Sequence, residues 1–172
     1  MKRGAALWRL AYLLAAGGVF LVDQMSKAWA ARALRFGSDR IIVPGLLNFS
    51  YAENRGIAFG QLQEGGPFGH WFLVALAGLA ALFVLLYFFR TPRSDDRVLG
   101  ACALLLAGIF GNLFDRVRLG FVIDFIDLHV SNHHWPTFNI ADASICIGAA
   151  LLALDIFRKE GGARREVGNG NR

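Results

Sequence analysis

Long runs of apolar residues dominate the sequence, and most charged residues fall between or beyond them. Four runs approach or exceed the roughly 20 helical residues needed to cross a hydrocarbon core of about 30 Å. They cover residues 8–29, 68–89, 98–115 and 138–157. This pattern predicts a mainly α membrane protein, with four transmembrane helices forming a single integral membrane domain over residues 1–172.

Two longer connections separate these runs, at residues 30–67 and 116–137. Within the first, residues 40–51 are rich in β-branched and aromatic residues and are interrupted by the turn signal Pro44-Gly45, which predicts a small β-structured segment. The second connection mixes apolar and polar residues and is expected to form a short amphipathic helix in the membrane interface. The polar tail at 160–172 is expected to be frayed.

Composition agrees with a membrane protein, because 55% of the residues are hydrophobic and the mean hydropathy is +0.44. The net charge of +5 reflects clustering rather than a nucleic-acid-binding face. Basic residues gather at the N-terminus, in the short loop between the second and third runs, and at the C-terminus: Lys2, Arg3, Arg9, Arg90, Arg93, Arg97, Arg158, Lys159, Arg164, Arg165 and Arg172. The positive-inside rule then places both termini in the cytoplasm and the two longer connections outside.

The N-terminal segment has features of a cleavable signal peptide, with basic residues, an apolar run and a small-residue site near Ala30. Asp23 and Lys27 interrupt that pattern, so the first helix is expected to remain uncleaved. The two cysteines, Cys102 and Cys146, lie inside apolar runs and are interpreted as packing residues rather than as a disulfide or zinc site.

Ionisable residues are costly inside a membrane span, so each one needs a reason. Asp23 and Lys27 are four residues apart on one helix face and are expected to neutralise each other. In the third span, two glycines and two polar residues share one side: Gly108, Gly111, Asn112 and Asp115. In the fourth span, Asn139 and Asp142 head a stripe of small residues that is expected to pack inward: Cys146, Ala149 and Ala153.

Several carboxylates are therefore expected near the outer ends of the last two spans. Asp115 and Asp142 lie in the spans, with Asp124 and Asp127 in the connection between them. Carboxylates at one depth repel each other, so the pKa of at least one is expected to be raised. An ionised carboxylate beside a protonated one can activate water and protonate a leaving amine, which is aspartic peptidase chemistry. The alternative is that these acids only pair with Arg116 and Arg118.

Spacing alone does not decide which two carboxylates act together. Asp115 and Asp124 are nine residues apart, which is about 900° on a continuous helix and so puts them on opposite faces. They can approach each other only if the helix breaks between them, and Gly120 is well placed to break it. Either Asp115 or Asp124 therefore remains a candidate partner for Asp142.

Three other functions compete with this interpretation. A metal-dependent hydrolase could use histidines and acids of the second connection, but there is no His-Glu-x-x-His pattern. The candidate ligands are His129, His133, His134, Asp124, Asp127 and Asp142. A proton- or cation-coupled transporter would need polar groups along a path, whereas these cluster at one face. A non-enzymatic membrane scaffold would use the polar residues only to join helices.

Five motifs in order resemble those of lipoprotein signal peptidase, also called signal peptidase II. They are Asp23-Gln24 with Ser26-Lys27, Asn54-Arg55-Gly56-Ile57-Ala58-Phe59-Gly60, Gly108 with Gly111-Asn112-Leu113-Phe114-Asp115-Arg116, Val122-Ile123-Asp124-Phe125, and Phe138-Asn139-Ile140-Ala141-Asp142. Together with the four-span pattern they cover nearly the whole chain. The resemblance implies an intramembrane aspartic endopeptidase that removes signal peptides from diacylglyceryl-modified prolipoproteins, cutting just before the lipidated cysteine.

The resemblance also implies roles for individual residues. Asp124 and Asp142 correspond to the family's catalytic aspartates. Residues that support the pair or hold the substrate correspond to Asn54, Gly56, Gly108, Asn112, Asp115, Arg116 and Asn139, and Asp23 and Lys27 correspond to a structural pair. No metal or cofactor is expected. The expected partners are lipid-modified prolipoproteins and membrane lipids, with the enzyme acting as a monomer in the bacterial cytoplasmic (inner) membrane and its active site near the outer face.

Overall fold

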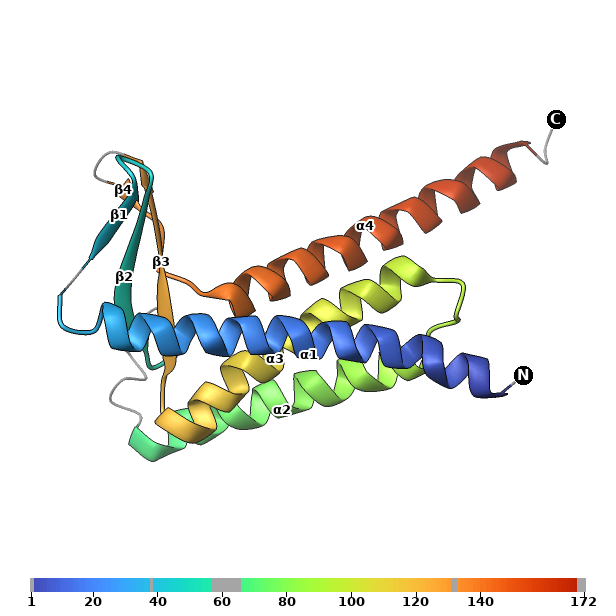
Figure 1. The fold of residues 1–172 in the computed structure, drawn as a ribbon. Helices are drawn as coiled ribbons and strands as arrows, with labels where there is room; N and C mark the ends of the chain where they lie inside the picture. Colours follow the sequence, from blue (N-terminus) through green and yellow to red (C-terminus); the bar gives the residue numbers. More distant parts are fainter. Residues whose placement is uncertain (1, 38, 57–65, 131–132, 170–172) are drawn as a thin grey trace.

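The computed structural model describes residues 2–37, 39–56, 66–130 and 133–169. Four long helices lie side by side, and a small antiparallel sheet caps one end of them (Figure 1). The elements in chain order are α1 (Lys2–Ala33), β1 (Arg40–Val43), β2 (Leu47–Asn54), α2 (Gly66–Arg90), α3 (Asp96–Leu119), β3 (Val122–Val130), β4 (His133–His134) and α4 (Ile140–Asn169).

Three helices of the described chain are long and apolar enough to cross a membrane, at Phe68–Arg90, Asp96–Leu119 and Ile140–Lys159. Two thirds of the α3 span is buried, against 17% for each of the other two, so α3 is the central helix and its neighbours turn apolar surface outward. α1 has 32 residues and packs along α3, but it carries Asp23 and Lys27. The fourth span therefore stays a prediction.

The end of the bundle opposite the sheet gathers the N-terminal half of α1, the α2–α3 connection and α4. Arg9 of α1 donates to the carbonyl oxygens of Phe89 and Thr91 at 3.0 and 3.1 Å. Lys159 of α4 pairs with Asp95 of the same connection at 3.2 Å. The tight hairpin predicted between the second and third runs is confirmed, and parts of the three basic clusters lie at this one end.

The sheet has the order β1-β2-β3-β4. The small β-structured segment predicted from residues 40–51 is confirmed: β1 and β2 pair as a hairpin, with Gly45 at φ 75° in the turn. β3 pairs antiparallel with β2 and joins the second connection to the first. Rings of Trp29, Phe49 and Phe125 meet edge to face at 5.6–6.3 Å, which seats the sheet on the end of α1.

The prediction of a short interfacial helix within residues 116–137 is wrong. In the described part of that segment, α3 ends at Leu119 and the chain continues as β3 and β4. Gly120 stops the helix in the left-handed conformation, at φ 83°, and its N–H caps the Arg116 carbonyl. The β-branched and aromatic residues that follow then pair with β2, a partner distant in sequence that the local amphipathic pattern could not reveal.

The predictions of a frayed tail and of an inward stripe of small residues in the fourth run are also wrong. The backbone of the tail continues as helix to Asn169 instead of fraying at residue 160. The inward face of α4 carries Ser144 and Gly148, while Cys146, Ala149 and Ala153 are exposed. Gly148 decides this face, because a Cβ there would lie 2.8 Å from the Ala101 carbonyl oxygen of α3. Cys102 is buried as predicted.

Candidate active site

Asp124 lies near the start of β3, where the sheet meets the helix ends. Its neighbours Ile123 and Phe125 are buried, and Asp124 itself is only 2% exposed. One carboxylate oxygen accepts a hydrogen bond from the Asn54 amide of β2 at 2.9 Å, and the other accepts one from the Asn139 amide at 2.7 Å. The acid is thus clamped between a strand and the start of α4.

Asp142 lies in the first turn of α4 and forms a capping box with Asn139. The Asn139 side-chain oxygen accepts the Asp142 N–H at 2.9 Å, and an Asp142 oxygen accepts the Asn139 N–H at 3.2 Å. The other Asp142 oxygen accepts a 2.7 Å bond from the Asn112 amide of α3. Helix capping therefore fixes this carboxylate in place.

Asn139 joins the two acids, and this is the central feature of the site. Its amide bonds Asp124, while its backbone N–H and side-chain oxygen hold Asp142. The same amide also reaches the Asn112 side-chain oxygen at 3.1 Å. Of the alternatives left open by spacing, the structure brings Asp124 and Asp142 together on one fully buried asparagine.

The pKa of Asp124 is raised to about 6, mainly because burial disfavours its charged form. The negative charge of Asp142 raises it further. The hydrogen bonds from Asn54 and Asn139 and the charge of Lys27 act in the opposite direction. A buried acid that keeps its proton well above its ordinary range, beside a second carboxylate, is the arrangement that general acid–base chemistry requires.

Asp115 forms an ion pair with Lys27 and is not held beside Asp142. Lys27 contacts Asp115 at 3.0 Å, Asp23 at 2.9 Å and the Asn112 side-chain oxygen at 3.0 Å. Its ammonium group has three donors, so these acceptors satisfy it completely. Asp115 also accepts the Ile123 N–H at 3.3 Å, which ties β3 to the end of α3. The predicted Asp23–Lys27 pair is present, with Asp115 as a second carboxylate.

Sequence reasoning did not assign Asp23 its full role and gave none to its neighbour Gln24. Asp23 accepts the Ala141 N–H at 2.8 Å, so a side chain of α1 caps α4. The Gln24 amide lies within 3.2 Å of acceptors on Asp23, Gly111 and Asp115. The only local signal was their adjacency in the Asp23-Gln24 motif.

The two glycines of the third run let α4 approach α3 at the depth of the acids. A Cβ on Gly108 would collide with the Ala141 carbonyl oxygen of α4, and one on Gly111 would lie 3.1 Å from the Ala141 Cβ and 2.7 Å from an Asp23 oxygen of α1. This close approach carries the first turn of α4, with Asp142, toward Asn112.

Arg116 and Gly56 lie together at the edge of the site. Gly56 has φ 93°, its N–H donates to the Asn54 side-chain oxygen at 2.8 Å, and a Cβ there would clash with Leu73. The Arg116 guanidinium lies 3.8 Å from the same point. Its buried Nε has no hydrogen-bond partner among the described residues. Residues 57–60 of the second motif lie outside the described residues.

Comparison with known proteins places this arrangement in a family. A family profile described as Signal peptidase (SPase) II matches residues 15–158, which include every residue of the site. The chain belongs to the signal peptidase II family. This is a family of aspartic peptidases, in keeping with the carboxylate pair of Asp124 and Asp142.

Known lipoprotein signal peptidases are similar to this chain over most of its length and most of their own. A lipoprotein signal peptidase of Alteromonas mediterranea is 38% identical over 168 residues, covering 94% of this chain and 92% of the relative. One from Polynucleobacter necessarius is 42% identical over 153 residues, covering 89% and 93%. A bacterial membrane enzyme solved by the in meso method at 2.3 Å resolution is similar in fold, with TM-score 0.78, 29% identity and coverage of 88% and 90%.

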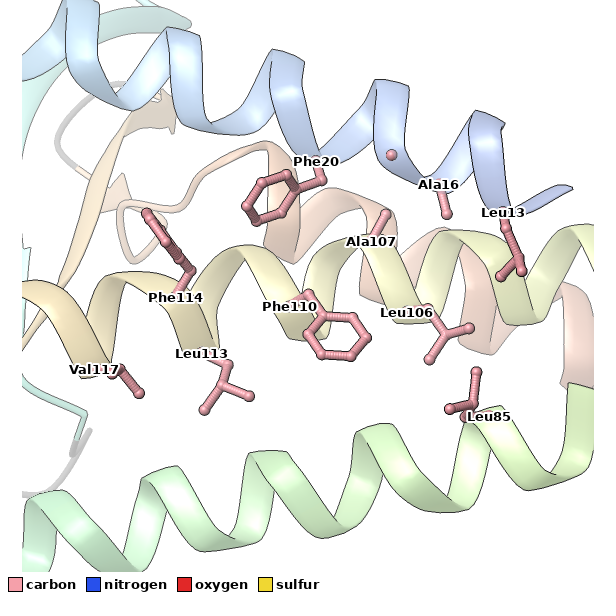
Figure 2. Close-up of a pocket in the computed structure, with 11 residues that line it drawn as sticks. Leu13, Ala16, Phe20, Leu85, Leu106, Ala107, Phe110, Leu113, Phe114 and Val117 are labelled. Atoms are coloured by element: carbon pink, nitrogen blue, oxygen red, sulfur yellow. The ribbon is translucent and has the colours of Figure 1, made fainter. Parts of the chain in front are cut away.

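The chain also has an apolar pocket of about 510 Å³ between α1, α2 and α3. Ala16 and Phe20 of α1 face Phe110 and Phe114 of α3 across it (Figure 2), and Gly17 of α1 also lines it. Phe114 immediately precedes Asp115, so the pocket extends along α3 to the turn that carries Asn112 and Asp115. It is a surface suited to an apolar chain or helix.

The histidines considered as metal ligands do not join the carboxylate pair. His129 and His134 lie beside Asp127 at the far end of β3, and His133 is not part of this group. Among the described residues, the hydrogen-bond partners of Asp124 and Asp142 are asparagine side chains and the backbone of Asn139.

Proposed function

We propose that this chain removes signal peptides from prolipoproteins that carry diacylglycerol on a cysteine, cutting just before that cysteine, with Asp124 and Asp142 as its catalytic pair. The observation that supports the pair most directly is their shared contact with Asn139. The relatives named lipoprotein signal peptidase support the substrate class. The pair requires neither a metal nor a cofactor.

The different surroundings of the two acids suggest separate roles. Asp124 is buried with its pKa raised to about 6, so it is the better proton donor. Asp142 accepts two N–H bonds in the first turn of α4, where the helix dipole favours negative charge. Asp142 takes a proton from water, whose oxygen attacks the scissile carbonyl carbon. The carbon–nitrogen bond then breaks, and Asp124 protonates the departing amine of the cysteine.

Arg116 would serve the substrate rather than the acids. Its Nε is a buried donor without a partner in the described part of the chain, and its guanidinium lies beside the backbone of Gly56. The amide groups of Asn54, Asn112 and Asn139 are already engaged. A carbonyl oxygen near the scissile bond would accept a bond from Arg116, which would position the peptide and stabilise developing charge.

The apolar pocket offers a place for the signal helix. Ala16 and Gly17 leave room on α1, and the lining is almost entirely apolar (Figure 2). A signal helix packed there would lead its C-terminal end along α3 toward the acids. Small residues permit such close helix contacts within lipid. The acyl chains of the substrate would remain in the surrounding bilayer.

The proposed membrane arrangement has four spans in one domain, with α1 as the fourth. Arg9, Lys159 and the α2–α3 connection lie together at one end, and the sheet lies at the other. The positive-inside rule would then put both termini in the cytoplasm and the site near the outer face. Both acids and their asparagines come from one chain, so a monomer suffices.

The test is cleavage in proteoliposomes given a diacylglyceryl-modified or an unlipidated prolipoprotein. The wild-type chain should cut only the lipidated form, before the cysteine. Asp124→Asn and Asp142→Asn should each lose about 10²- to 10⁴-fold in kcat, the usual contribution of a general acid or base. The matched control is Asp155→Asn, which alters an α4 carboxylate paired with Lys159 far from the acids.

Melting curves of all three variants would separate loss of chemistry from loss of folding. A folded Asp124→Asn or Asp142→Asn enzyme that kept wild-type turnover would remove that residue from the pair. Cutting of the unlipidated substrate at an equal rate would refute the substrate class.

A further inference from the structure

A second group of metal-binding side chains lies on the β3–β4 hairpin, away from the carboxylate pair. Asp127 and His129 are two residues apart on β3, so they share one face of the strand. His134 of β4 lies opposite His129 in the antiparallel register. The two imidazole rings stack with centroids 4.7 Å apart and planes 18° apart. Pairing of the strands therefore brings three potential ligands together.

One nitrogen in this group has no partner to satisfy it. The His129 side chain is only 10% exposed, and its Nδ1 makes no hydrogen bond within the described chain. The nearest acidic atom is Asp127 Oδ2, at 4.0 Å. Asp127 is already engaged, since Oδ1 lies 2.9 Å from His134 Nδ1 and Oδ2 accepts a 3.5 Å bond from Asn48. A buried polar nitrogen left unpaired destabilises the fold unless something binds it.

We propose that Asp127, His129 and His134 bind a divalent transition metal ion, with Zn²⁺ as the ion their chemistry suits best. Two imidazole nitrogens and one carboxylate oxygen are a common three-residue zinc set, with water as the fourth ligand. One potential ligand atom from each residue lies within 4.8 Å of the other two. Bonds of about 2.0–2.1 Å need a spacing of about 3.3 Å. The side chain of His134 is 53% exposed, so a bound ion could draw it closer without displacing a buried neighbour.

The three proposed ligands lie on β3 and β4, just before the segment that leads to the active site. After His134, the Trp135 N–H donates to the Leu128 carbonyl at 2.7 Å, and Phe138 exchanges hydrogen bonds with Ile126. Asn139, which joins the two acids, follows directly. Because β4 has only two residues, a bound ion would add a cross-link between β3 and this segment. Binding to the folded state alone would raise its stability.

Titration of the tag-free protein in detergent with Zn²⁺, followed by calorimetry, tests the site. The wild-type chain should bind one ion per chain at these residues. His129→Ala and His134→Ala should each weaken binding by at least about a hundredfold, because losing a residue that merely orients a metal ligand already costs about 10- to 100-fold. The matched control is His133→Ala, which removes the neighbouring exposed histidine outside the group and should leave binding unchanged.

Two further measurements make the result decisive. Zn²⁺ should raise the melting temperature of the wild-type chain and of His133→Ala, but not of His134→Ala. Should His129→Ala fail to fold, Asp127→Asn keeps the side-chain shape and should also lose binding. Binding that persists in His134→Ala, or that disappears in Asp142→Asn while His134→Ala retains it, would overturn the proposal. The outcome does not depend on the proposed peptidase activity, because it measures metal uptake directly.

Discussion

Asn139 shows how one buried side chain can organise two acids from different elements. It caps α4 and holds Asp142 through the capping box, and its amide bonds Asp124 on β3. An N-cap asparagine is common for local reasons, because it satisfies free N–H groups at a helix start. Here the same residue also fixes the placement of the proposed proton donor relative to the proposed base.

The raised pKa of Asp124 predicts how catalysis depends on pH. If Asp124 must carry the proton, kcat/KM, which reports ionisations of the free enzyme, should fall as pH rises through about 6, the raised pKa of Asp124. Asn54 donates to Asp124 and lowers this pKa, so Asn54→Ala should move the alkaline limb to higher pH. The measurement is kcat/KM from pH 5 to 9 with lipidated substrate.

Stability should change with pH in the matching direction. Folding raises the Asp124 pKa from 3.8, so the folded chain binds this proton more tightly than the unfolded one. The contribution of Asp124 to the free energy of unfolding is fully present below about pH 4 and is lost as pH rises through about 6. Asp124→Asn should remove this part of the melting profile. For catalysis, a shift of the alkaline limb of kcat/KM to lower pH in Asn54→Ala would contradict the assignment of Asp124 as proton donor.

Among the helices, α3 and α4 determine whether the two acids can meet. Gly108 and Gly148 remove the Cβ atoms that would separate the helices, at Ala141 and at Ala101 respectively. Lys27 connects α1 to α3 through Asp115, and Asp23 connects α1 to the start of α4. Three helices are therefore tied together by buried polar contacts just below the sheet. Breaking a buried ion pair of this kind generally destabilises a fold strongly.

Enlarging a glycine at this contact should move α4. Gly108→Ala would push a Cβ against the Ala141 carbonyl, displacing the first turn of α4 and costing about 1–3 kcal/mol through overpacking. Both the rate of prolipoprotein cleavage and the melting temperature should fall. The matched control is Gly78→Ala in α2, where a Cβ has nothing within 4 Å and helix propensity should improve. Equal effects of the two changes would show that the α3–α4 contact does not control the site.

For the molecule as a whole, charge and architecture agree on two distinct ends. Arg9 contacts the α2–α3 connection and Arg93 stacks on Trp8, while the sheet and acids lie at the opposite end (Figure 1). A bilayer would enclose the apolar surface between these ends. That surface includes exposed side chains along α2 and α4, such as Phe83 and Leu154.

Labelling of single cysteines in intact cells tests this orientation. In a chain carrying Cys102→Ala and Cys146→Ser, Asp39→Cys should react with an impermeant thiol reagent added from outside. Arg93→Cys should react only after the membrane is permeabilised, because the positive-inside rule keeps its loop in the cytoplasm. The reverse pattern, or labelling of both from one side, would contradict the proposed orientation, in which α2 crosses the membrane with Asp39 outside and Arg93 inside.

Much of this protein could be predicted without its structure because membrane proteins encode topology locally. Apolar runs predicted the helices, Pro44-Gly45 predicted a turn within a small β-structured segment, and acids and amides near helix ends indicated the candidate site. Family motifs assigned Asp124 and Asp142 as the pair. These features depend on hydrophobicity, turn chemistry and the cost of burying charge, which act over a few neighbouring residues.

Pairing between distant segments had to come from the folded chain. β3 resembles an amphipathic helix until β2 lies beside it, and the inward face of α4 follows Gly148 rather than the expected stripe of small residues. Spacing left Asp115 and Asp124 as alternative partners for Asp142. The structure shows instead that Asp115 forms an ion pair with Lys27 of α1. Such contacts join residues up to 118 positions apart, and local pattern carries no information about which of them meet.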